Sequence, residues 1–122
     1  MNPSFAPKID WIYREDGAPD YSSIADVLGV SQEVLARILD VSESTLRNKR
    51  VSASTLGKTT ALIHILNMLW DLSGQNKGQI RRFMHEPRQE WGGVTPILLL
   101  SSGRSAAVAK FLEGLIDGDP IS

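Results

Sequence analysis

No cysteine occurs among the 122 residues of the chain. Disulfides, thiolate metal sites and cysteine nucleophiles are therefore excluded, and the absence favours a cytoplasmic location. Long hydrophobic runs are missing as well, because the longest strongly apolar stretch, Ala61 to Trp70, is too short to cross a bilayer. Residues 1–10 lack the apolar run of a signal peptide. We expect a cytoplasmic protein without a signal peptide or membrane association.

Constellations typical of enzymes are also missing. No histidines and carboxylates stand at the spacing of metal ligands, and the serines, including Ser101 and Ser102, have no base placed beside them. Residues 57–59, Gly-Lys-Thr, resemble the end of a phosphate-binding loop. That loop requires glycine where Ser52 stands, and a preceding strand. We expect no enzymatic activity, no cofactor and no metal.

The net charge of −1 is unevenly distributed along the chain. Residues 1–43 contain three basic and eight acidic residues, a net charge of −5. Residues 44–85 contain seven basic residues and one acidic residue (+6), and residues 86–122 contain three basic and five acidic residues (−2). A basic middle segment can bind a polyanion locally while the acidic ends contact something else. Chance clustering of charges on a solvated surface would give the same counts.

Apolar residues recur at helical spacing, and no segment alternates convincingly with period two, so we expect an all-α fold. Residues 1–20 are expected to form a loosely ordered extension, in which Trp11, Ile12 and Tyr13 dock on the body. Ser31 is a natural N-cap, as is Thr95, which Pro96 follows at the first helical position. The expected helices are 22–28, 32–39, 43–50, 56–72, 77–84, 97–100 and 105–117.

Two of these helices carry more specific expectations. The helix 56–72 is apolar nearly all round, so it should be buried in the core or in a dimer interface, with His64 hydrogen-bonded there. The last helix should end at Gly118. Its expected core face consists of Val108, Phe111, Leu112, Leu115 and Ile116.

The most informative segment is 30–50. Two short helices, capped by Ser31 and Ser42, are joined by about three residues, and Ala36 allows them to approach closely. This pattern predicts a helix-turn-helix whose second helix enters the major groove of DNA. Asp40 stands where glycine is usual, and aspartate tolerates a left-handed backbone. An ordinary helical hairpin with a solvated polar face remains the alternative.

The outward face of the second helix has the side chains that read base edges. Arg47 can bind guanine, Asn48 can bind adenine, and serine or threonine can serve either. Gln32, at the start of the preceding helix, suits a phosphate. The candidate DNA-binding residues are Gln32, Ser42, Ser44, Thr45, Arg47, Asn48, Lys49, Arg50 and Lys58.

Residues 21–50 resemble the Xre class of helix-turn-helix regulators. Residues 56–118 are similar to the C-terminal toxin-binding domain of the Xre/MbcA/ParS antitoxins. In this pattern a large residue precedes a proline, a glycine-containing loop leads to Thr-Pro and an apolar turn, and a final helix ends in glycine. The residues that carry the likeness are Phe83, Pro87, Gly92, Gly93, Thr95, Pro96, Leu98, Leu99, Gly103, Val108, Leu112, Ile116 and Gly118. Phe83 stands where tryptophan is commoner.

The resemblance implies an all-α homodimer with an N-terminal extension (1–20), an Xre-like helix-turn-helix region (21–55) and a small helical toxin-binding and dimerisation domain (56–122). It implies an antitoxin that represses its own operon and blocks the active site of a RES- or ParT-type toxin acting on NAD. The implied toxin-binding residues are Arg104, Lys110, Phe111, Glu113, Gly114, Asp117, Gly118, Ile121 and Ser122. The alternative is a stand-alone helix-turn-helix repressor without a toxin partner, whose C-terminal part only dimerises.

Overall fold

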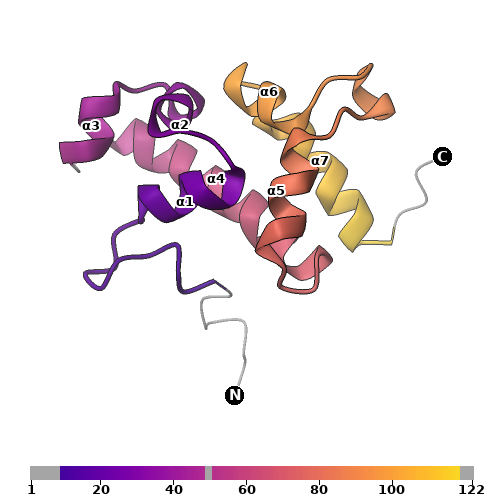
Figure 1. The fold of residues 1–122 in the computed structure, drawn as a ribbon, viewed down its shortest axis with the longest axis horizontal. Helices are drawn as coiled ribbons and strands as arrows, with labels where there is room; N and C mark the ends of the chain where they lie inside the picture. Colours follow the sequence, from indigo (N-terminus) through magenta and orange to yellow (C-terminus); the bar gives the residue numbers. More distant parts are fainter. Residues whose placement is uncertain (1–8, 49–50, 119–122) are drawn as a thin grey trace.

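The computed structural model describes residues 9–48 and 51–118, and this part of the chain is all-helical. Figure 1 shows α1–α3 on one side of the molecule and α5–α7 on the other, with the long helix α4 running behind both groups. Two isolated β-bridges, Tyr13 with Pro19 and Arg88 with Val94, are the only strand-like pairings among these residues. The helices are α1 (Tyr21–Leu28), α2 (Gln32–Leu39), α3 (Glu43–Asn48), α4 (Ala53–Leu72), α5 (Lys77–His85), the 3₁₀ helix η2 (Gln89–Trp91), α6 (Pro96–Ser101) and α7 (Ser105–Ile116).

Helix starts follow the capping residues in the sequence. The side chain of Ser31 accepts a hydrogen bond from the backbone N–H of Val34, and the Thr95 side chain accepts one from Leu98, as predicted. Ser52 caps α4 in the same way, so this helix begins at Ala53, three residues before the predicted start. The apolar pattern alone could not locate that start, because it begins only at Leu56.

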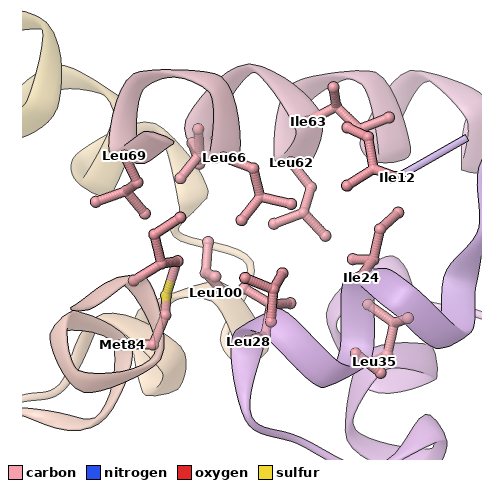
Figure 2. Close-up of a cluster of buried hydrophobic side chains, with 14 of the residues drawn as sticks. Ile12, Ile24, Leu28, Leu35, Leu62, Ile63, Leu66, Leu69, Met84 and Leu100 are labelled. Atoms are coloured by element: carbon pink, nitrogen blue, oxygen red, sulfur yellow. The ribbon is translucent and has the colours of Figure 1, made fainter. Parts of the chain in front are cut away.

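The core lies between α4 and the helices that pack on it. In Figure 2, Leu62, Leu66 and Leu69 point from α4 towards side chains of α1, α5 and α6. Helix α4 makes its most extensive contact with α7, α1 packs on α5, and α2 packs on α6. The predicted boundary between residues 55 and 56 lies in the first turn of α4, so one helix contributes to both parts.

The N-terminal segment docks on this core through two isoleucines. Ile12 has no exposed surface and Ile9 is 1% exposed. Trp11 is half-buried, with its ring centroid 5.6 Å from that of Trp70. The predicted docking is therefore confirmed for Trp11 and Ile12, but Tyr13 is exposed and the prediction was wrong for it.

Two expectations for the core face of α7 are wrong, and the expectation for His64 on α4 is met only in part. Leu115 and Ile116 were expected in the core face of α7 but are 43% and 46% exposed, because the buried stripe ends at Leu112. His64 was expected to be hydrogen-bonded in the core or in a dimer interface; its side chain is 57% exposed in the single chain, with Nε2 3.3 Å from Oε2 of Glu113, so it lies outside the core and the interface alternative stays a prediction. The periodicity of a helix shows which residues share a face, and it does not show where the neighbouring helix stops.

Candidate nucleic-acid interface and C-terminal helix

The turn between α2 and α3 has the geometry that the sequence predicted. Asp40 adopts a left-handed conformation with φ 59° and ψ 48°, and its backbone N–H bonds to the carbonyls of Ala36 and Arg37. Ala36 is 3% exposed, so its small side chain lies inside the contact. The Ser42 hydroxyl accepts the backbone N–H of Thr45 at 3.1 Å and starts α3. Two capped helices with a tight left-handed turn form a helix-turn-helix.

Helix α3 is held by one buried side chain and presents its other residues to solvent. Leu46 is 3% exposed and fixes the helix on the core. Glu43, Ser44, Arg47 and Asn48 are exposed, and Thr45 is half-buried. The hydroxyls of Ser42 and Thr45 lie 2.8 Å apart, so they partly satisfy each other. No residue within 9–48 and 51–118 forms an ion pair with Arg47, which leaves its guanidinium available to a ligand.

Two of the predicted DNA-binding residues already have partners within the protein. Lys58 on α4 lies 3.3 Å from the Asp40 carboxylate, so it compensates the negative charge that aspartate brings to the turn. Gln32 donates from Nε2 to the Ser22 hydroxyl at 3.3 Å, which joins the first turns of α1 and α2. Both contacts are solvent-accessible and can be exchanged for an anion at little cost. Lys49 and Arg50 lie outside the described residues.

The predicted toxin-binding residues are spread along α7. Lys110, Glu113 and Asp117 follow one another at spacings of three and four, so they share an exposed face of the helix. Gly118 follows with φ 69° and ends the helix, as predicted. Arg104 is exposed at the N-terminal end, and Gly114 is half-buried. Ile121 and Ser122 lie outside the described residues.

Phe111 occupies a different environment from the rest of that set. Its ring centroid lies 6.5 Å from Phe83 and 5.3 Å from Trp91, and the Arg88 guanidinium carbon lies 4.8 Å from the ring centroid. Phe83, Phe111 and Arg88 line a small apolar groove of about 180 Å³ between α4, α5 and α7, which Leu72 and Leu115 also line. Local spacing could not predict the groove, because its residues come from three separate helices and the loop after α5.

Arg88 also organises the loop after α5. Its Nη2 donates to Oε2 of Glu90 at 3.1 Å. A hydrogen bond from the backbone N–H of Glu90 itself, together with this one from Arg88, holds the pKa of the Glu90 carboxyl below its usual range. The Glu90 carboxylate therefore neutralises the Arg88 guanidinium, and the loop does not present an unpaired cation.

Neither a metal site nor a membrane-spanning helix occurs among the described residues. Across residues 9–48 and 51–118, no group of three or more His, Asp or Glu side chains could hold a metal ion. The same part of the chain contains no helix with the length and hydropathy needed to cross a membrane. The exposed faces of α3 and α7 therefore remain the surfaces of interest.

The geometry of α2 and α3 is that of a helix-turn-helix, a motif that many DNA-binding regulators use. One known family matches this part of the chain. Residues 14–61 match the family model of the antitoxin Xre-like helix-turn-helix domain. No curated protein matches the chain.

Proposed function

We propose that this protein is an antitoxin of the Xre/MbcA/ParS type, which binds the DNA of its own operator through α3 and neutralises a RES- or ParT-type toxin through its C-terminal region. The observation that carries the DNA-binding half is the exposed polar face of α3, supported on a helix-turn-helix that matches an antitoxin family over residues 14–61.

In the proposed complex, α3 lies in the major groove. Arg47 binds O6 and N7 of guanine, Asn48 binds adenine, and Ser44 and Thr45 contact neighbouring bases. Ser42 at the start of α3, together with Gln32, Lys49, Arg50 and Lys58, contacts the phosphate backbone on either side. Phosphate contacts fix the position of the helix, and the base contacts select the sequence.

We place the protein on DNA as a homodimer. Helix-turn-helix dimers bind two half-sites about one helical turn apart, so the operator should contain an inverted repeat. Each subunit then contributes one copy of α3, and residues 56–122 supply the dimer contacts.

The toxin-binding half rests on α7 and the residues after it. Lys110, Glu113 and Asp117 offer an exposed charged face, and Leu115 and Ile116 add exposed apolar surface beside it. A surface with apolar side chains surrounded by charges is typical of a protein–protein contact. Arg104, Gly114, Gly118, Ile121 and Ser122 extend the proposed contact, and Phe111 supports it from below by packing on Phe83, Trp91 and Arg88.

Both halves can be tested with the full chain. Fluorescence anisotropy with a duplex from upstream of its gene should show salt-sensitive binding that is stronger than binding to a shuffled duplex of the same composition. Equal affinity for the two duplexes would show that the protein does not recognise an operator sequence in the upstream duplex. Growth of cells that express the toxin encoded beside the gene should recover on co-expression of this protein. Sequence-specific DNA binding without rescue or co-purification would instead leave a stand-alone repressor.

A further inference from the structure

A second arginine lies close to α3, on the segment that precedes the helix-turn-helix. The N-terminal turn is the turn at residues 13–19, which the bridge between Tyr13 and Pro19 closes. An open hollow of about 470 Å³ lies between this turn and the first turns of α1, α2 and α3. Arg14, Ser22, Gln32 and Arg47 line it, together with the acidic residues Asp20 and Glu43. We propose that this hollow seats a phosphate of the DNA backbone, with Arg14 as a binding residue. The proposal rests on the DNA-binding function above and adds the N-terminal turn to its interface.

The backbone around Arg14 is fixed by several contacts. The N–H of Arg14 donates to the carbonyl of Ala18 at 2.7 Å, and the N–H of Gly17 donates back to the Arg14 carbonyl at 2.9 Å. Tyr13 and Pro19 form a bridge across the same turn. The buried Ile12 anchors the turn on the core. Little backbone entropy is therefore lost when Arg14 binds a ligand.

The Arg14 guanidinium is oriented without being fully occupied. Its Nη2 lies 2.9 Å from Oδ2 of Asp16, and its side chain is 31% exposed. The other carboxylate oxygen of Asp16 accepts the backbone N–H of Ala18 at 3.0 Å, which holds the acid in place. A guanidinium has five N–H donors, so Nη1 keeps its two N–H groups for a phosphate while Nη2 contacts Asp16.

Two cationic and two anionic residues line the hollow, so their formal charges balance, and the dipole of α2 adds a partial positive charge. Gln32 stands at the start of α2, where the helix dipole is positive. Oδ1 of Asp20 accepts the N–H of Ser23 and caps α1. Glu43 opposes an anion, and Arg47, for which the described part of the chain supplies no ion-pair partner, offsets it. The family match begins at residue 14, so it includes this arginine and its turn.

The test compares duplex binding by the wild-type chain and by Arg14→Ala, Arg14→Lys and Arg82→Ala over about 50 to 200 mM salt. Arg82 is an exposed arginine on α5, outside the helix-turn-helix, and serves as the matched control. Arg14→Ala should weaken binding to the upstream duplex and to a shuffled duplex by the same factor. The slope of log K against log salt should become shallower by about 0.9, the value for one lost phosphate contact. Arg82→Ala should match the wild type.

Arg14→Lys separates the loss of a contact from damage to the fold. Lysine keeps the charge, so this variant should retain the wild-type slope. Binding by Arg14→Ala with unchanged affinity and slope would overturn the proposal, as would a slope for Arg14→Lys equal to that of Arg14→Ala. A change in discrimination between the two duplexes would also overturn it, because a phosphate contact carries no sequence information. If the wild type binds neither duplex, the proposed DNA-binding function itself fails.

Discussion

At the scale of single residues, Arg47 is the side chain with the strongest chemistry for sequence discrimination. It is exposed on α3, and none of the residues placed by the structure pairs with it. A bidentate contact of arginine with guanine contributes about 1–3 kcal/mol of discrimination. Arg47→Ala should therefore weaken binding to the operator by about 1–3 kcal/mol, with a much smaller loss on shuffled DNA, as measured by anisotropy.

The matched control for this prediction is again Arg82→Ala, which removes an exposed arginine from α5. Equal losses for Arg47→Ala on operator and shuffled DNA would identify Arg47 as a phosphate contact. An unchanged operator affinity at moderate salt would show that α3 is not the recognition helix.

Gly29 shows how a single residue connects the two sides of the molecule. It ends α1 with φ 72°, and a Cβ atom there would lie 2.6 Å from Cγ of Arg81 and 3.0 Å from Nε2 of His85. Arg81 donates to the carbonyl of Asp26 from Nε at 3.2 Å and from Nη2 at 3.1 Å. His85 Nε2 lies 2.9 Å from the carbonyl oxygen of Leu28. Residues of α5 thus satisfy the carbonyls that the end of α1 leaves without helical partners.

Gly29→Ala should therefore lower the free energy of unfolding by more than the backbone strain alone. The left-handed conformation costs an L-residue about 1–2 kcal/mol, and displacement of Arg81 adds to that. Gly103→Ala is the control, because Gly103 has φ 76° but nothing within 4 Å of an added Cβ. Urea unfolding followed by circular dichroism should show the larger loss of stability for Gly29→Ala. Equal losses would mean that the contact between α1 and α5 contributes nothing measurable.

At the scale of elements, capping and turn residues located the helices better than the apolar pattern did. Ser31 and the Thr95-Pro96 pair gave the correct starts of α2 and α6, and Asp40 took the left-handed conformation predicted for it. These signals are local, so the neighbouring residues are sufficient to interpret them. The exposure of Leu115 and Ile116 depends on where α4 ends, which is a tertiary fact.

The same distinction applies to the candidate site. The exposed face of α3 followed from the position of Leu46 and the helical repeat, so the sequence was sufficient to predict it. The pair between Lys58 and Asp40 joins residues 18 positions apart, and the hollow at Arg14 joins three helices to a loop. The spacing of residues along the sequence predicts neither the ion pair nor the hollow, because both form only when the helices pack together.

The proposed toxin contact makes a prediction about one element, the end of α7. Deletion of residues 114–122 removes Leu115, Ile116 and Asp117 but keeps the buried Val108 and Leu112. The shortened protein should lose rescue of toxin-expressing cells and still bind operator DNA. Glu113→Lys, which reverses an exposed charge without touching the core, should weaken toxin binding in a pull-down assay. Full rescue by the shortened protein would show that the toxin binds elsewhere.

At the scale of the whole molecule, the helix-turn-helix and the C-terminal helices share a core. Leu66 has no exposed surface, and α4, to which it belongs, packs against α2, α5 and α7. A cavity at this position removes contacts from both sides at once. Leu66→Ala should therefore destabilise the protein by about 2–5 kcal/mol, the range for buried leucine truncations.

The shared core also determines which helices lose stability in Leu66→Ala. If the two sides fold as one cooperative unit, amides in α2 and in α7 should lose protection together in hydrogen exchange followed by mass spectrometry. Leu98→Ala, at a position that is 53% exposed on α6, should leave both sets of amides almost unchanged. Faster exchange confined to α7 would divide the molecule into two folding units. Faster exchange in both helices would mean that a ligand bound at α3 can alter the stability of α7, and the reverse, because both sides of the molecule pack on α4.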